Sequence, residues 1–181
     1  DLLSMVDSPF VIHLYKTYKD EQFVYLLLEV ALGGSLHEFY HQHPEVFSED
    51  NPHGAAAAFY AACITSGLEH LHERRIVYRD LKPENVIIDE RGYGKLCDMG
   101  FARFVLGKTN TLVGTPEYMA PEMIDFPHSH DMAVDWWALG VLTYELLTGQ
   151  PPWEDEGIAE PCAKILAIRR SQERDEPRFP F

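Results

Sequence analysis

The chain has 181 residues, of which 46% are hydrophobic and 24% charged, and this composition excludes a disordered protein. Its 29 acidic and 15 basic residues give a net charge of −14, which disfavours nucleic acid and favours basic proteins or peptides as partners. The three cysteines form no CxxC pair, which favours a reducing, cytoplasmic location. No apolar run reaches the roughly 18 residues needed for a membrane span.

The first part of the chain predicts a pair of strands followed by two helices. Residues 10–14 and 23–30 are rich in β-branched and aromatic side chains and flank a polar segment, which predicts paired strands. Ser35 follows two glycines and is a suitable N-cap for a helix through Gln42. A long helix is expected from Gly54, because apolar side chains recur at helical spacing: Tyr60, Ile64, Leu68 and Leu71.

The second part predicts short strands, a long loop and a buried helix. Three short strands are expected around a polar loop and a glycine turn, at residues 76–78, 86–88 and 95–97. Residues 100–121 show no period, and long loops in compact domains are usually functional. Residues 135–147 are apolar almost all round, which predicts a helix in the centre of a domain. The tail from residue 154 is charged, and no element is predicted there.

Five motifs follow one another through the middle of the chain. Residues 78–85 read YRDLKPEN, and the triplet DMG begins at Asp98, eighteen residues after Asp80. The motifs GTPEY, APE and DWWALG begin at residues 114, 120 and 135. Singly, such Asp- and Gly-containing motifs are typical of turns. In this order they resemble the catalytic loop, metal-binding triplet, activation segment and following buried helix of protein kinases, in wording closest to the cAMP- and cGMP-dependent kinases of the AGC group.

The resemblance implies an α+β, protein-kinase-like fold, mostly the helical C-terminal lobe with the last strands of the N-terminal lobe. Residues 1–181 would form a partial kinase domain, with 1–30 as the end of the N-terminal lobe and the hinge. Residues 31–181 would form the C-terminal lobe, truncated at its end. The Gly-rich loop, the strand lysine and its paired glutamate do not occur, so the chain by itself is expected to be inactive or nearly so.

The resemblance also implies a serine/threonine kinase that uses ATP and Mg²⁺. Asp80 would accept the hydrogen of the substrate hydroxyl and orient its oxygen. Lys82 would place its charge on the transferring phosphate, and its presence marks Ser/Thr specificity by resemblance. Asn85 and Asp98 would supply hard oxygen ligands to Mg²⁺. Met99 replaces the usual Phe of the triplet and is apolar enough to fill the same position.

By the same resemblance, the nucleotide would lie between the hinge and the catalytic loop. The implied nucleotide-binding residues are Leu28 as gatekeeper, the Glu29 carbonyl, the Ala31 amide, Ile87 as floor, and Lys82, Asn85 and Asp98. Cys97 would border this pocket, and its sequence context favours a small buried apolar residue.

Activation and substrate choice are implied at further positions. Thr111 stands where related kinases are phosphorylated, and a phosphate there would add about −1.5 to −2 charges for Arg79 and Arg103 to bind. Glu84 and Glu145 match carboxylates that read basic side chains before the target residue. By the same resemblance, Thr115 would be a third substrate-binding position.

One position departs from the pattern of close relatives, and two further positions match it. Ser35 replaces a glutamate that contacts ribose and a substrate arginine in close relatives, which leaves the strength of the basic preference open. Glu122 and Asp135 match architectural positions. A cyclic-nucleotide-binding regulatory domain or subunit would be the expected partner.

Three other interpretations were weighed against the kinase. His37 to His41 read HEFYH, the HExxH pattern of zinc metallopeptidases, but no third ligand stands at the expected spacing. Residues 107–109 read GKT, as at the end of a P-loop, but the preceding glycine is six residues away instead of four. A non-catalytic pseudokinase or scaffold lobe is the alternative from another class, and the retained Asp80, Lys82, Asn85 and Asp98 argue against it.

Overall fold

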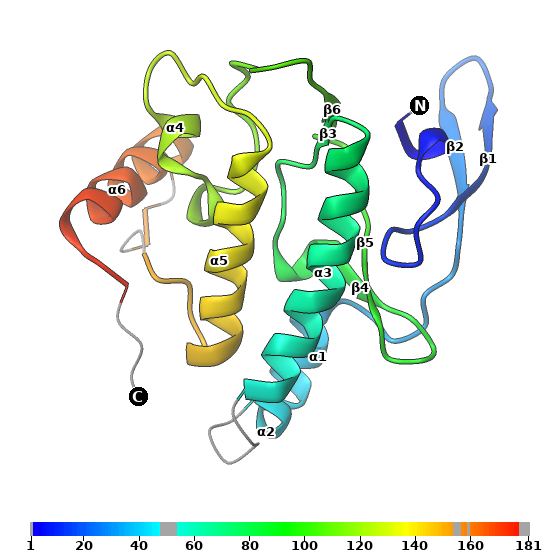
Figure 1. The fold of residues 1–181 in the computed structure, drawn as a ribbon, viewed down its shortest axis with the longest axis horizontal. Helices are drawn as coiled ribbons and strands as arrows, with labels where there is room; N and C mark the ends of the chain where they lie inside the picture. Colours follow the sequence, from blue (N-terminus) through cyan, green and yellow to red (C-terminus); the bar gives the residue numbers. More distant parts are fainter. Residues whose placement is uncertain (1, 48–53, 154–156, 159, 178–181) are drawn as a thin grey trace.

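The structure is a computed structural model that describes residues 2–47, 54–153, 157–158 and 160–177. Figure 1 shows two long helices, α3 and α5, side by side in the middle of the molecule, with the β1–β2 hairpin at one edge and α4 and α6 at the other. The helices are α1 Leu36–Gln42, α2 Pro44–Phe47, α3 Ala55–Glu73, α4 Pro121–Ile124, α5 Ala133–Thr148 and α6 Pro161–Arg174. The strands are β1 Leu14–Lys19, β2 Val24–Leu28, β3 Ile76–Val77, β4 Val86–Ile88, β5 Gly94–Leu96 and β6 Arg103–Phe104.

The predicted strand pair exists, but its first strand begins later than predicted. β1 pairs with β2 in antiparallel register, from Leu14 opposite Leu28 to Lys19 opposite Val24. The prediction of a strand at residues 10–14 was therefore wrong in position. Val11 and Ile12 are apolar core residues outside β1. Ile12 donates its N–H to the Leu96 carbonyl at the end of β5 (2.8 Å). The hairpin is largely solvent-exposed, so the apolar pattern was a poor guide to β1.

The helix predicted after Ser35 is confirmed with its cap. The Ser35 hydroxyl accepts the Glu38 N–H, and the Glu38 carboxylate accepts the Ser35 N–H, both at 3.1 Å. This capping box satisfies two donors at the start of α1. The long helix predicted from Gly54 is confirmed as α3, and its predicted face is buried in the main core: Tyr60, Ile64, Leu68 and Leu71.

The strands that carry the site follow α3. The prediction for β4 agrees with its observed bounds, and β4 pairs with β5 in antiparallel register from Val86 opposite Leu96 to Ile88 opposite Gly94. β3 pairs with β6, which lies inside the segment predicted as a loop. Most of that segment is irregular, apart from β6 and a 3₁₀ turn at Pro116–Tyr118.

Of the last two long helices, α5 was predicted from the hydrophobic pattern of the sequence and α6 was not. α5 is confirmed, but it is buried on one side only, since Trp136 is 39% exposed. α6 was not predicted, because its composition is polar and only Ile168 is fully buried. The Glu160 carboxylate caps it by accepting the Ala163 N–H (2.6 Å). None of the helices in the described ranges is long and apolar enough to cross a bilayer.

Candidate active site

The loop before β4 is fixed in place by a buried carboxylate from α5. Asp135, 1% exposed, accepts the Tyr78 N–H at Oδ2 (2.9 Å) and the Arg79 N–H at Oδ1 (2.8 Å). Its Oδ2 also lies 2.7 Å from Nε2 of His72 on α3. Arg79 has a positive φ of 70°, a conformation that few non-glycine residues adopt without such support. Asp135 therefore joins α3, α5 and the loop, as its predicted architectural role requires.

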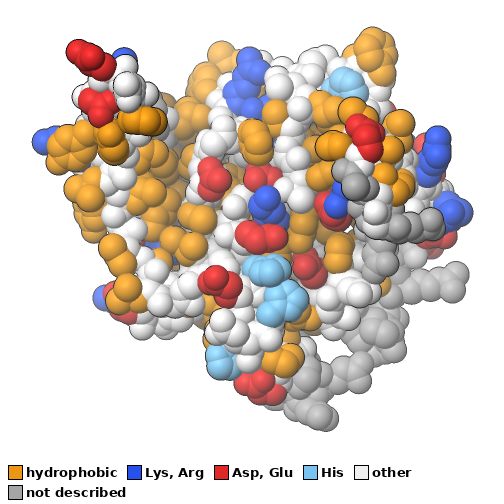
Figure 2. All heavy atoms as spheres, turned by 180° about the vertical axis from the view of Figure 1, so that it is seen from behind, with side chains coloured by type: hydrophobic (Ala, Val, Ile, Leu, Met, Phe, Trp, Pro, Cys, Tyr) orange, Lys and Arg blue, Asp and Glu red, His pale blue; other side chains and the backbone are white. Residues whose placement is uncertain are grey.

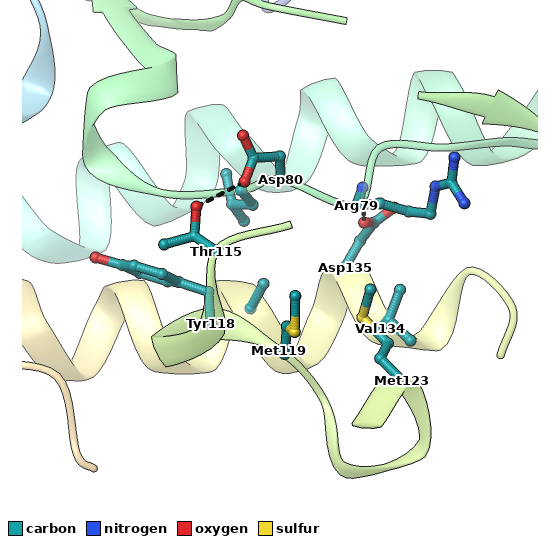
Figure 3. Close-up of a pocket in the computed structure, with 10 residues that line it drawn as sticks. Arg79, Asp80, Thr115, Tyr118, Met119, Met123, Val134 and Asp135 are labelled. Carbon is teal, nitrogen blue, oxygen red and sulfur yellow. Dashed lines mark hydrogen bonds between the residues drawn. The ribbon is translucent and has the colours of Figure 1, made fainter. Parts of the chain in front are cut away.

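The residues predicted for catalysis form one hydrogen-bonded group. The Thr115 hydroxyl donates to Asp80 Oδ1 (2.8 Å), as Figure 3 shows, and accepts from Lys82 Nζ (2.9 Å). Asn85 Nδ2 donates to the Asp80 carbonyl (2.8 Å) and to Asp80 Oδ2 (2.9 Å). Lys82 Nζ lies 3.6 Å from Asp80 Oδ2. The Asp80 carboxylate is thus held from both sides in one orientation.

The segment that carries Thr115 passes very close to the predicted catalytic loop, residues 78–85. Gly114 has a φ of +114°, and a Cβ atom at this position would lie 2.6 Å from the Arg79 carbonyl oxygen. Only glycine fits such a backbone contact. Behind it, a cavity of about 10 Å³ lies between Asp80, Thr115, Asp135 and apolar side chains of α4 and α5, as Figure 3 shows. The close packing fixes Thr115 against Asp80.

The two predicted metal ligands are brought together by the β4–β5 pair. The Cys97 N–H donates to the Asn85 carbonyl (2.9 Å), so Cys97 lies beside Asn85 and Asp98 follows it in the chain. Asp98 is exposed and has a positive φ of 48°, and its Oδ1 accepts the Gly100 N–H (3.0 Å). The described residues contain no cluster of three or more His, Cys, Asp or Glu side chains that suits a metal ion. Two hard oxygen donors fit Mg²⁺, which keeps waters and phosphate oxygens as its other ligands.

Cys97, next to Asp98, is partly buried as its sequence context indicated. Burial, followed by the charge of Asp98, raises the pKa of its thiol to about 11. The thiol therefore remains protonated at neutral pH.

The segment that follows the predicted hinge, residues 33–35, lies against β4. The Gly33 N–H donates to the Ile88 carbonyl and the Ile88 N–H to the Gly34 carbonyl, both at 2.9 Å. A Cβ atom on Gly33 would lie 2.8 Å from the Ile88 carbonyl oxygen, so the two segments could not approach this closely with another residue there. This pairing brings the segment after Leu28 towards Ile87, the predicted floor of the adenine site.

The Glu29 side chain is engaged away from the backbone groups predicted to bind adenine. Its carboxylate forms an ion pair with Lys95 and accepts the His13 N–H (3.2 Å). Burial opposes ionisation of Glu29, but these hydrogen bonds outweigh it and lower its pKa. The Glu29 carbonyl and the Ala31 N–H take part in none of the backbone hydrogen bonds found in the described part of the chain. Both groups are therefore available to a ligand.

The predicted phosphorylation site, Thr111, contacts Arg103, whose charge acts in turn on Arg79. Arg103 Nη1 donates to the hydroxyls of Thr111 (2.9 Å) and Thr109 (3.3 Å). Arg79 donates its Nε–H to the Phe101 carbonyl (2.8 Å), while its buried Nη1 has no hydrogen-bond partner among the described residues. Burial and then the charge of Arg103 lower the pKa of Arg79. The segment thus combines a hydroxyl with a concentrated positive charge.

Of the two carboxylates predicted to bind basic substrate side chains, Glu145 is influenced by the charge of Glu84. Burial raises the pKa of Glu145, and the nearby charge of Glu84 adds to this rise, whereas a hydrogen bond from the Tyr118 hydroxyl opposes it. Tyr118 was missed by the sequence interpretation, although it belongs to the GTPEY motif. Glu84 itself is exposed on the 3₁₀ turn Pro83–Asn85. This cluster is acidic and accessible at Glu84.

Some predicted roles find no partner in the structure. Glu122, on α4, is exposed and makes no hydrogen bond or ion pair with the described residues. The GKT segment at 107–109 is not followed by a helix, and the Thr109 backbone instead pairs with His130.

The sequence interpretation also missed His72, the partner of Asp135, because nothing in the sequence links residues 63 positions apart.

Fold and site together define a protein kinase domain. The protein kinase domain family matches residues 1–179, and the chain belongs to this family. The predicted fold class, a kinase-like fold made mostly of the helical lobe, is thereby confirmed.

The chain is similar in sequence to cAMP- and cGMP-dependent protein kinases. It is 47% identical over 169 residues to the cAMP-dependent protein kinase catalytic subunit of Dictyostelium discoideum, covering 93% of this chain and 25% of the relative. It is 44% identical over 179 residues to human cGMP-dependent protein kinase 2, covering 98% and 22%. It is 45% identical over 166 residues to the human cAMP-dependent protein kinase catalytic subunit PRKX, covering 92% and 44%. The chain therefore spans less than half the length of each of these relatives.

Proposed function

We propose that this chain is the catalytic part of a serine/threonine protein kinase that transfers the γ-phosphoryl group of ATP to hydroxyls of protein substrates. The observation that carries the proposal is the group formed by Asp80, Lys82 and Thr115. Similarity to cAMP- and cGMP-dependent kinases supports Ser/Thr specificity. In this assignment residues 1–30 complete the N-terminal lobe and hinge, and residues 31–181 belong to the C-terminal lobe of a cytoplasmic enzyme.

Asp80 is the residue that meets the attacking hydroxyl. Thr115 and Asn85 fix its carboxylate, so that it can accept the hydrogen of a substrate hydroxyl and point the oxygen at the phosphorus. Lys82 stands next to this carboxylate and stabilises negative charge on the transferred phosphoryl group. Since both groups are held before substrate arrives, little reorganisation is needed during transfer.

Asn85 and Asp98 are the proposed ligands of Mg²⁺. Bound Mg²⁺ neutralises charge on the phosphate oxygens of ATP. The Glu29 carbonyl and the Ala31 N–H bind adenine, with Leu28 and Ile87 beside it. The paired Lys95 and Glu29 side chains stiffen the hinge behind these groups.

Glu84 and Glu145 select substrates with basic residues before the target. A guanidinium that approaches Glu145 would meet a half-buried carboxylate, where charge pairing is less screened than at the surface. Phosphorylation of Thr111 would bring a dianion to Arg103 and to the free Nη1 of Arg79, and would order the segment that carries Thr115. The similarity to cyclic-nucleotide-dependent kinases suggests a cyclic-nucleotide-binding domain or subunit as regulator.

The test is peptide phosphorylation by the full-length protein and its Asp80→Asn variant with Mg²⁺ and ATP. Wild-type protein is expected to phosphorylate an arginine-containing peptide more efficiently than a matched arginine-free peptide. Asp80→Asn is expected to lower kcat by about 10²–10⁴-fold while nucleotide binding is retained. A wild-type protein that binds nucleotide without any transfer would instead be the scaffold lobe of the alternative hypothesis.

A further inference from the structure

Two histidines on α1 face each other without a role in the proposed kinase site. His37 and His41 are separated by one helical turn, and their Nε2 atoms lie 3.1 Å apart. The ring centroids are 4.4 Å apart, and His41 is exposed. Figure 2 shows histidine side chains next to acidic ones near the centre of this face. The pair is therefore accessible to a ligand from solution.

The separation of the two nitrogens is that of a metal chelate. Imidazole nitrogens bind Zn²⁺ at about 2.0–2.1 Å, and two such bonds at right angles or tetrahedral angles place the nitrogens about 2.8–3.4 Å apart. A hydrogen bond between the rings uses the same lone pair that a metal would take. If both rings carry their proton on Nδ1, both Nε2 lone pairs are free for an ion.

The neighbouring groups limit what this ion can be. Within the described ranges no third His, Cys, Asp or Glu completes a ligand set, so water would fill the remaining positions. Glu38, between the two histidines, accepts the Ser35 N–H in the capping box and is not directed to the pair as a catalytic base. These facts favour a surface chelate over a metallopeptidase centre.

We propose that His37 and His41 bind one divalent transition-metal ion, with Zn²⁺ as the physiological candidate. Imidazole ligands suit Zn²⁺, Ni²⁺ and Cu²⁺ far better than Mg²⁺. α1, which carries the pair, packs against the 3₁₀ turn Pro83–Asn85 with Glu84, and the charge of His37 acts on Glu145 as well. Metal at the pair therefore adds positive charge beside a carboxylate that, under the proposed function, binds a basic substrate side chain.

Metal binding is tested on the full-length protein, with the exposed Cys162 replaced by Ser in every variant to remove a competing thiol. Titration with Zn²⁺, and separately with Ni²⁺, is expected to show one site of 1:1 stoichiometry. His37→Gln and His41→Gln should each weaken it by at least about tenfold, since even loss of a group that supports a ligand costs about 10–100-fold. The control His13→Gln, an exposed histidine on another segment, should bind as the parent does. Equal binding by all four chains, or no such site in the parent, would overturn the proposal.

The effect on substrate binding is measured on the full-length protein. Zn²⁺ is expected to raise KM for an arginine-containing peptide severalfold with little change in kcat, and His37→Gln should remove this effect. An unchanged KM at saturating Zn²⁺ would reject the link to Glu145. A protein without transferase activity would refute the proposed function, whereas the titration would still decide the metal site.

Discussion

Replacing Asp135 by Ala removes the acceptor on which the catalytic loop depends. Three donors meet this side chain: the N–H groups of Tyr78 and Arg79 and the ring of His72. Tyr78 and Arg79 are buried, and His72 is half-buried. Water can therefore replace the lost oxygens only in part.

The expected cost follows from these donors. A buried donor left without a partner costs about 1–3 kcal/mol, and removal of one member of a buried charged pair costs about 3–5 kcal/mol. The adjacent cavity of about 10 Å³ has room for roughly one water molecule, which would satisfy some of the donors. We expect Asp135→Ala to lower the free energy of unfolding by about 3–5 kcal/mol, a large part of the about 5–15 kcal/mol typical of a domain.

The assay is urea unfolding of the 181-residue chain followed by circular dichroism. Asp7→Ala is the matched control, because it removes the same charge from an exposed position, and it should change stability by less than about 0.5 kcal/mol. Asp135→Asn retains one acceptor oxygen and should lie between the two. A loss below about 1 kcal/mol for Asp135→Ala would show that the loop does not depend on this carboxylate.

Further predictions concern the catalytic group, the buried thiol and α6. In the full-length protein, Thr115→Val should lower kcat by about 10–100-fold, because a hydrogen bond to a charged group contributes about 1.5–3 kcal/mol. The control Thr115→Ser keeps the hydroxyl and should retain most of the activity. Equal activity of the two variants would contradict this prediction. At pH 7.5 iodoacetamide should modify the exposed Cys162 well before Cys97, whose pKa is raised to about 11, and mass spectrometry of peptides would reveal the opposite order. Arg169 on α6 donates two hydrogen bonds to Asp125 (2.8 and 2.7 Å) and lowers its pKa, so this pair stabilises the fold above the ordinary carboxyl pKa and the contribution is lost as the pH falls below it. Because Asp125 is half-exposed, Arg169→Ala should lower the free energy of unfolding in urea by only about 0–1 kcal/mol at pH 7 and should leave it unchanged at pH 2. A loss of stability that is larger at pH 2 than at pH 7 would refute the pairing.

The sequence alone was sufficient to locate the residues proposed for catalysis and metal binding within one short segment. Asp80, Lys82 and Asn85 lie within six residues, so their spacing is read directly from the chain. The long helices were also predictable, because the apolar face of α3 recurs at helical spacing and α5 is strongly apolar. Local chemistry further predicted the cap of α1 at Ser35.

Only the tertiary structure decided which distant groups meet. The contacts of Asp135 with Tyr78 and His72 join residues 57 and 63 positions apart, and that of Tyr118 with Glu145 joins residues 27 apart. Residues 10–12 and strand β1 were misplaced, because burial depends on what packs against a segment and its composition does not reveal this. Local pattern thus determined the long helices α3 and α5 and the proposed catalytic motif, whereas packing between α3, α5 and the loop at residues 78–85 decided how the motif is held.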